Sequence, residues 1–389
     1  MTIEQLFFEL TQVAIGTRIC LSHTPSADEW GELYAMAKKQ SLIGICFAAV
    51  QKLQCNDHQE PRTKNPQSEP TQNQEPRTQN LDEVLYLTWM GMAAKIQQRN
   101  EVVNRQCGEV QAKLSAEGFR SYIMKGQAVG TLYGSLAGLR QSGDIDVYLE
   151  GGLDKVLAYA RTFGEVGKVN ELEMSMPVYD DTEVEFHYRP FIMRNPFKNA
   201  KLQVFFKICE DKNFSNSLIL DKEKNLSICA PTIEFNLVHQ LVHTYHHFIT
   251  EGVGLRQLMD YHFVLKHEME VENGSNVKKV REVVESLGLK KFASALMWVM
   301  QHVFGLGMIG MPWIPNQRDG EFLLKEIMMS GNFGHTDERA MDIQTSRWKS
   351  FWFVNGKTFR FWRFDHWAWF WSPVWRMYHF AWRKMKGFK

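Results

Sequence analysis

The sequence predicts an α+β protein, in which one small mixed sheet with flanking helices is joined to an N-terminal helical segment and a C-terminal helical region. Apolar residues recur at steps of three and four over 85–114 and again after 232, which is the period of amphipathic helices. Between these stretches, 145–149 and 183–188 alternate between apolar and other residues, as strands do. The expected division of the chain is an N-terminal helical segment at 1–55, a disordered polar insertion at 56–80, a long helix at 81–118, an α/β core at 119–230 and a helical region with an aromatic, basic tail at 231–389.

The bulk composition excludes several classes of protein. With 44% hydrophobic and 23% charged residues and a net charge of +1, the 389-residue chain is typical of globular proteins and has no overall attraction to nucleic acid or anionic lipid. Its six cysteines form no C-x-x-C pair, so the spacing indicates neither a zinc knuckle nor a disulfide framework. Glu4 and Glu9 fall where a signal peptide would be apolar, and no apolar run is long enough to span a membrane. We therefore expect a cytoplasmic protein with no membrane span.

The N-terminal segment is predicted to be helical up to a polar break. Ser26 and Asp28 are capping residues, Trp30, Leu33 and Ala37 follow at helical spacing, and an apolar run extends to Val50. The stretch 56–80 then has no aliphatic or aromatic residue and contains four of the twelve prolines. Such a segment buries too little apolar surface to offset its ordering entropy. We expect a disordered surface insertion rather than a binding motif.

The long helix at 81–118 is followed by a change of period. Leu85 to Leu114 form an apolar stripe, and Gly118 stands where a C-terminal cap belongs. The shorter elements predicted after it are a strand at 119–124, a helix at 127–133, a strand at 145–149, a helix at 153–163 and a strand at 183–188.

The C-terminal region returns to helical spacing. The helices expected here lie at 233–249, 255–267, 277–286 and 290–304. The last 43 residues hold eight of the twelve tryptophans and ten Lys or Arg against one acid. We expect these aromatic residues to pack on the core or in a dimer, with stacking on nucleic acid and contact with a membrane surface as alternatives.

Two acidic residues on one predicted strand carry the chemistry. Asp144 and Asp146 are two apart, so they point to the same face while Ile145 and Val147 point to the other. Neighbouring carboxylates repel one another unless a positive charge lies between them. A pair of Mg²⁺ ions bridged by triphosphate oxygens would neutralise both, with Mn²⁺ as an alternative.

A third carboxylate comes from the strand predicted at 183–188. Glu183, Glu185 and His187 share one face of this strand. If it lies beside the Asp144 strand in register, Glu185 completes the metal site or accepts a proton from an attacking hydroxyl. The alternative is that each acidic strand is simply half-buried, with a solvated face.

Two glycine turns are candidates for contact with phosphate. Lys125-Gly126 ends a predicted strand and opens a helix, where backbone N–H groups and the lysine charge can approach an anion. Gly134-Ser135, eight residues before Asp144, is the other candidate. Arg140 could pair with phosphate oxygens.

Together these motifs resemble the uncharacterised nucleotidyltransferase family of the DNA polymerase β-like nucleotidyltransferase superfamily. The segments 30–53 and 235–265 resemble the helical parts of the same family. The residues that carry the resemblance are Lys125-Gly126, Arg140, Gly143-Asp144-Ile-Asp146 and Val184-Glu185-Phe-His187.

The resemblance implies a nucleotidyltransferase that moves a nucleoside monophosphate from a triphosphate such as ATP to an acceptor, releasing pyrophosphate. It makes Asp144 and Asp146 the ligands of two Mg²⁺ ions and Glu185 the third acid. Gly134-Ser135 matches the superfamily's Gly-Ser turn in residue types and spacing, whereas Lys125-Gly126 matches it in its position after a strand. Both turns therefore stay candidates. The acceptor, small or macromolecular, is not encoded in a recognisable motif. The alternative function is a non-catalytic nucleotide- or RNA-binding protein on the same fold.

Two further groups of polar residues lie in the predicted C-terminal helices. His239, His243, His246 and His247 fall within nine residues, and members four apart share a helix face. We favour packing for them over contact with a nucleotide or acceptor, or zinc binding. Arg256 and Asp260, also four apart, are expected to form an internal ion pair, with contact between Arg256 and phosphate as the alternative.

Overall fold

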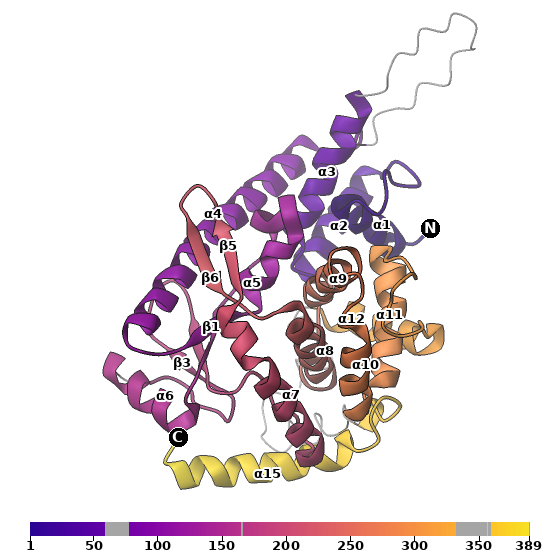
Figure 1. Cartoon of the computed structure of the whole chain (residues 1–389). Helices are drawn as coiled ribbons and strands as arrows, with labels where there is room; N and C mark the ends of the chain where they lie inside the picture. Colours follow the sequence, from indigo (N-terminus) through magenta and orange to yellow (C-terminus); the bar gives the residue numbers. More distant parts are fainter. Residues whose placement is uncertain (59–77, 165, 332–355, 357–358, 389) are drawn as a thin grey trace, which may run out of the picture.

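The computed structural model describes residues 1–389 apart from 59–77, 165, 332–355, 357–358 and 389. The described residues have the predicted α+β architecture, with a four-stranded mixed sheet, a two-stranded sheet and helices before and after them (Figure 1). Most of the insertion predicted to be disordered at 56–80 lies outside the described residues.

Three N-terminal helices pack together at one end of the molecule (Figure 1). The second begins where the sequence predicts, because Ser26 Oγ accepts a hydrogen bond from the Glu29 backbone N–H at 3.2 Å and the Glu29 side chain accepts one from the Ser26 backbone at 2.8 Å. Its buried Trp30 and Leu33 contribute to the core shared with the other two. These helices are α1 (Ile3–Ile15), α2 (Ala27–Lys39) and α3 (Ile43–His58).

Helix α4 (Glu83–Ala116) connects this helical end to the sheet. Near its start, Trp89 is fully buried, and its indole N–H donates a hydrogen bond to the Ile43 carbonyl at 2.8 Å. Farther along, Val103 and Val110 pack into the apolar core beneath the sheet. Gly118 has a φ of 78°, a left-handed conformation that suits glycine and lets the chain turn back into the first strand.

The main sheet has the strand order β1-β2-β4-β3. β2 runs parallel to β4, and both outer pairs are antiparallel. β3 is not predicted from the sequence, because its four residues are too few to show a clear period. The strands are β1 (Ser121–Met124), β2 (Ile145–Leu149), β3 (Glu173–Met176) and β4 (Val184–His187).

The two faces of the sheet differ as the alternation predicts. Val147 and Phe186 lie in the apolar core under α4. Asp146 and Glu185 lie on the other face, and β2 and β4 pair so that these two residues are direct partners. The parallel register therefore sets the two carboxylates side by side.

Several elements between the strands were not anticipated. Helix α7 (Pro196–Ser215) escaped notice because Val204 and Ile208 are exposed on its outer side, which blurs the helical period. The remaining elements of this region are α5 (Gly126–Gly130), the 3-10 helices η1 (Thr131–Leu139) and η2 (Arg161–Phe163), α6 (Gly152–Ala160), β5 (Ser217–Asp221) and β6 (Leu226–Cys229).

The C-terminal region is helical, and its first four helices begin at the predicted residues. They are α8 (Ile233–Thr250), α9 (Leu255–Glu270), α10 (Val277–Ser286) and α11 (Lys290–Phe304), followed by α12 (Gln317–Ser330) and α15 (Ala368–Lys386), which were not predicted separately. None of the helices in the described ranges is both long and apolar enough to cross a membrane.

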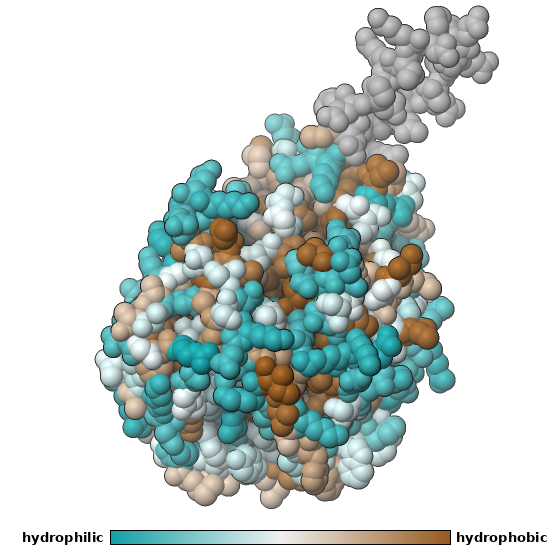
Figure 2. Space-filling model, in the orientation of Figure 1, coloured by the Kyte–Doolittle hydropathy of each residue, from teal (hydrophilic) through white to brown (hydrophobic). Residues whose placement is uncertain are grey.

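The aromatic tail packs on the core in part. Phe361 and Phe364 are buried, with ring centroids 4.3 and 5.7 Å from that of Phe248. In Figure 1, α15 lies along the lower edge of the molecule, below α7 and close to α6. Figure 2 shows that the face in view is mostly hydrophilic, with apolar residues exposed singly or in small groups. The tail residues 347–355, 357–358 and 389 lie outside the described part of the chain.

Candidate active site

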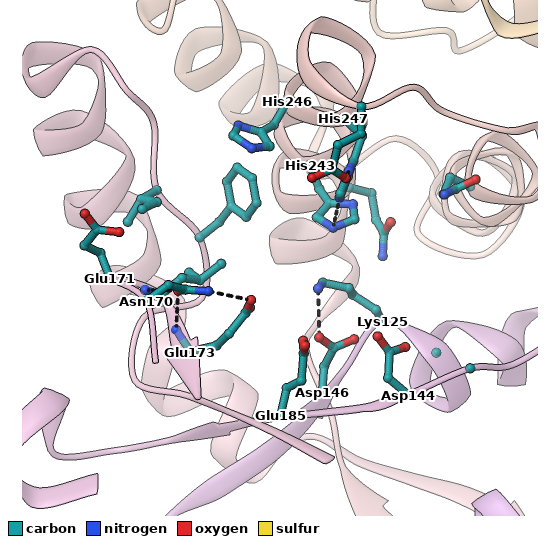
Figure 3. A pocket seen from close by; sticks show the side chains of 18 of the residues that line it. Lys125, Asp144, Asp146, Asn170, Glu171, Glu173, Glu185, His243, His246 and His247 are labelled. Carbon is teal, nitrogen blue, oxygen red and sulfur yellow. Dashed lines mark hydrogen bonds and ion pairs between the residues drawn. The ribbon is translucent and has the colours of Figure 1, made fainter. Parts of the chain in front are cut away.

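A cavity of about 480 Å³ lies between the polar face of the sheet and helices α8 and α9, with α15 at its edge. This volume falls within the range of about 300–1,000 Å³ that is usual for small-molecule sites. Figure 3 shows that Asp144, Asp146 and Glu185 lie together on one side, and that His243, His246 and His247 lie across the cavity from them. The structure thus brings the three predicted acidic residues to one cavity.

The two aspartates have different surroundings. Asp146 is only 3% exposed, whereas Asp144, directly before β2, is exposed. The charge of Asp146 raises the pKa of Asp144. Burial by itself would raise the pKa of Asp146 too, but Lys125 and His187 hold it well below its usual range. The site therefore keeps one firmly ionised carboxylate beside a second that is repelled by it.

Two cationic side chains neutralise Asp146. Its Oδ1 lies 2.9 Å from Lys125 Nζ and 2.8 Å from His187 Nε2. His187 is fully buried, and its Nε2 also lies 3.2 Å from a Glu173 oxygen and 3.6 Å from a Glu185 oxygen. Burial opposes a charge on this imidazole, but Glu173 and its other carboxylate neighbours raise its pKa to about 9. Burial chiefly raises the pKa of Glu185, against the hydrogen bond from His187.

Glu173 is a member of the site that the sequence did not single out. It lies on β3, pairs with His187 across the sheet and lines the cavity. A signal was present in the alternation of Glu173, Met174, Ser175 and Met176, in which the two methionines are buried, but methionine-rich runs of four residues are weak evidence for a strand.

The Lys125-Gly126 turn borders the same cavity, while the Gly134-Ser135 turn does not. Lys125 has a φ of 47° and Gly126 a φ of 33°, so the chain turns sharply between β1 and α5. A positive φ at a residue other than glycine is strained, and such strain is common at functional sites. Gly134 and Ser135 instead line a separate hollow beside residues of α1 and α9.

Arg140 lines the cavity but is held by a protein carboxylate. It is 2% exposed, and its Nε and Nη2 each lie 2.7 Å from an oxygen of Asp260. Tyr133 donates a third hydrogen bond to Asp260 at 2.6 Å. The internal partner of Asp260 is thus Arg140 rather than Arg256, which donates to the Gln141 carbonyl at 3.3 Å. Helical spacing suggested the wrong arginine because Arg140 is distant in sequence.

The histidine cluster of α8 divides between the cavity and the core. His239 is fully buried and lies 3.2 Å from the Pro190 carbonyl, whereas the other three line the cavity. The Nε2 atoms of His243 and His247 are 3.0 Å apart, so one ring donates to the other. Burial lowers the pKa of both His243 and His246. The expected packing role fits His239, and the other three face the cavity.

The acidic side of the cavity has a donor set that suits a divalent cation. Asp146, Glu185 and His187 each offer a ligand atom, and these atoms all lie within 4.8 Å of one another. Asp144 adds a carboxylate that forms no ion pair with any described residue. Mg²⁺ prefers oxygen ligands, and His187 already donates to Asp146. The fit is therefore best for a hard cation held by the carboxylates.

Comparison with protein families matches residues 26–305 to a family described as an uncharacterised nucleotidyltransferase. The chain belongs to this nucleotidyltransferase family. The match contains the whole acidic side of the cavity and the histidines of α8, whereas Trp375 and His379 of α15, which also line the cavity, follow it in the chain. A search of curated proteins finds no match. The nucleotidyltransferase core is thus supplemented at its cavity by a C-terminal helix outside the matched segment.

Proposed function

We propose that the chain is a Mg²⁺-dependent nucleotidyltransferase that transfers a nucleoside monophosphate from a nucleoside triphosphate to an acceptor, with release of pyrophosphate. The observation that carries this proposal is the parallel pairing of Asp146 with Glu185. These two residues and Asp144 line one cavity, which the Lys125-Gly126 turn also borders. A solvated acidic strand face would need no such convergence. Two half-buried acidic strands that served only structure would not have to face a cavity lined by two lysines and four histidines.

The triphosphate fits best at the end of the cavity near the Lys125-Gly126 turn. Lys125 supplies a positive charge there, and Arg256 also lines the cavity. Arg140 retains only its Nη1 for a phosphate, since this buried nitrogen has no hydrogen-bond partner among the described residues, while the rest of its guanidinium binds Asp260. We favour this turn over Gly134-Ser135, because the latter lines a different hollow.

The three acidic residues have distinct proposed roles. Asp144 and Asp146 would hold two Mg²⁺ ions, with Glu185 completing the set. When bound, Mg²⁺ neutralises triphosphate oxygens and stabilises the charge that develops during the transfer. Lys125 and His187 keep Asp146 ionised, as its lowered pKa indicates.

Glu185 is also the best-placed proton acceptor. Its raised pKa makes it a stronger base than an exposed carboxylate. In the proposed reaction an acceptor oxygen or nitrogen attacks the α-phosphorus, forming a new bond while the bond to the pyrophosphate oxygen breaks. The acceptor's proton passes to Glu185, and pyrophosphate leaves with the electron pair of the broken bond.

The direct test supplies each of the four NTPs, labelled at the α-phosphate, with Mg²⁺ and a cell extract as the source of acceptors. We expect label to appear in an acceptor and pyrophosphate to be released, and we expect EDTA to stop both. Asp146→Asn should lower transfer by at least about a hundredfold, because it removes a carboxylate that would bind both the metal and Lys125.

The matched control is Glu183→Gln, which removes an exposed carboxylate directly before β4, the strand of Glu185, but outside the cavity. This variant should retain transfer, and circular dichroism should show that both variants are folded. Wild-type transfer by folded Asp146→Asn would rule out the proposed role of the carboxylates. Binding of NTP or RNA that ignores Asp144 and Asp146, without turnover, would favour a non-catalytic binding protein.

A further inference from the structure

Helix α15 borders the end of the cavity away from the Lys125-Gly126 turn. Trp375 and His379 of this helix line the cavity, and His379 Nε2 lies 3.2 Å from a Glu171 oxygen. One turn before Trp375, Ser372 Oγ accepts a hydrogen bond from Arg194 Nη1 at 2.8 Å. Helix α15 lies outside the segment that matches the family, whereas Glu171 and Arg194 lie inside it, so residues of both parts meet at this end of the cavity.

Arg194 is a partly buried cation with one hydrogen bond to a described side chain. It lines the cavity, and its buried Nε has no hydrogen-bond partner within the described part of the chain. None of the described carboxylates forms an ion pair with it. Burial, and then the like charge of Arg376, lower its pKa to about 10. A buried N–H donor without an acceptor is unfavourable, so the unpartnered Nε of a guanidinium at a cavity points to a ligand that supplies the acceptor and the negative charge.

Two acidic residues, Glu171 and Glu251, also line the cavity. Glu251 lies 3.0 Å from His247 Nδ1, and Glu171 lies beside His379. Burial raises the pKa of Glu171, which reduces its tendency to carry a charge. Lys168 also lines this end of the cavity and adds a second cation. The local balance therefore leaves positive charge at this end, in contrast to the acidic residues around Asp146.

The acidic residues separate this end from the proposed triphosphate position. In Figure 3, Lys125 and Asp144 lie on one side of Asp146 and Glu185, whereas Glu171 and Asn170 lie on the other. A molecule held on the Glu171 side would reach Glu185 from the direction opposite to the triphosphate. Attack on the α-phosphorus opposite to the leaving pyrophosphate needs this arrangement.

We propose that Lys168, Arg194 and His379 form an anion subsite, which binds a phosphate or carboxylate group of the acceptor and directs its attacking atom toward Glu185. This inference rests on the proposed function and names the class of acceptor, an oxyanion-bearing molecule. Arg194 supplies the planar donor pair that phosphate and carboxylate oxygens match, and Ser372 orients it. Helix α15 contributes His379 to this subsite and Ser372 to the position of Arg194.

The test measures binding of inorganic phosphate and, separately, of acetate to the full chain by calorimetry, at constant ionic strength and without Mg²⁺. We expect saturable binding of at least one anion, and which of them binds more tightly tells phosphate from carboxylate. Arg194→Gln should weaken this binding at least about tenfold, because a charge-assisted hydrogen-bond donor is lost. ATP affinity should stay within about twofold, since Arg194 is proposed to serve the acceptor rather than the triphosphate.

Arg161→Gln is the matched control, because Arg161 is an exposed arginine that does not line the cavity. It should leave anion binding unchanged. Arg194→Lys, which keeps the charge and loses the planar donor pair, should bind the anion more tightly than Arg194→Gln. The melting temperature of Arg194→Gln should equal or exceed that of the wild type, since a partly buried charge without an ion-pair partner among the described residues is removed. A clear fall in melting temperature would make Arg194 a structural residue and overturn the proposal.

Two binding results would also overturn it. One is the absence of saturable binding of either anion to the wild-type chain. The other is an equal loss of ATP and anion affinity in Arg194→Gln, which would assign Arg194 to the triphosphate. Failure of the proposed function would appear in a different assay, namely as unchanged nucleotidyl transfer by Asp146→Asn. That variant should still bind the anion, so the two failures can be told apart.

Discussion

The buried ion pair of Arg140 and Asp260 joins the polar edge of the main sheet to helix α9, and Asp260→Asn tests its contribution to stability. Arg140 is 2% exposed and Asp260 is 4% exposed. Two of the three hydrogen bonds to the Asp260 carboxylate come from Arg140, at 2.7 Å each, and the third comes from Tyr133 at 2.6 Å. The substitution keeps the shape of the side chain but removes its charge and turns one acceptor into a donor that faces Arg140.

The expected loss follows from this burial. Removing one partner of a buried pair leaves the other charge uncompensated, which costs about 3–5 kcal/mol. That is a large part of the total stability of a protein, about 5–15 kcal/mol. At about 1.4 kcal/mol for each factor of ten, the folding equilibrium constant of Asp260→Asn should fall by two to four orders of magnitude.

The assay is equilibrium unfolding in urea, followed by both tryptophan fluorescence and circular dichroism so that a departure from two-state behaviour is visible. Glu285→Gln is the control, because its partner Lys290 lies at a similar distance, 3.1 Å, but on the surface. It should cost no more than about 1 kcal/mol. Adding Arg140→Met to Asp260→Asn should restore much of the loss, since no unpaired charge then remains. A cost below about 1 kcal/mol for Asp260→Asn, or no recovery in the double variant, would refute the reasoning.

Two further predictions follow from the same structure. Although burial favours protonation, Arg140 holds the pKa of Asp260 below its usual value. The stability advantage of wild type over Asp260→Asn should therefore be complete above the unfolded-state pKa of about 3.9 and should shrink as the pH falls through the folded-state pKa. Urea unfolding at a series of pH values measures this advantage, and a pH-independent difference would contradict the prediction. Gly320→Ala should destabilise the fold by about 1–3 kcal/mol, because the added Cβ would lie 2.5 Å from the Trp298 ring. Gly31→Ala in α2, with open space around its Cβ position, should instead stabilise the fold by up to about 1 kcal/mol. Thermal melts of both variants test this, and equal shifts in melting temperature would show that the Trp298 ring moves aside at little cost.

Much of the acidic site could be predicted because alternation along a strand is a local property. Asp144, Asp146 and Glu185 were placed on strand faces from their spacing alone, and the register of β2 with β4 makes two of them direct neighbours. Their roles in metal binding stay a prediction that the proposed transfer assay tests. Glu173 was missed because β3 is short, and its closeness to His187 depends on a strand pairing that no local pattern encodes.

The two glycine turns show what the sequence left open. Lys125-Gly126 and Gly134-Ser135 are both plausible from composition and spacing, yet only the former borders the acidic cavity. The difference arises because η1 carries the second turn toward α1 and α9. A direction of this kind depends on how helices pack, and packing is decided by contacts between residues far apart in the chain.

The sequence by itself determined the fold class, the strand faces that carry Asp146 and Glu185, and the first residues of four C-terminal helices, since periodicity and capping act over a few neighbouring residues. Only the tertiary structure decided that Arg140 pairs with Asp260, that three histidines of α8 face the acidic residues and that α15 brings Ser372 to Arg194. The Arg140 and Ser372 contacts join segments separated by more than a hundred residues. The histidines face a cavity that forms only when such segments pack together. The energy of burying apolar surface selects that packing, and no local pattern records it.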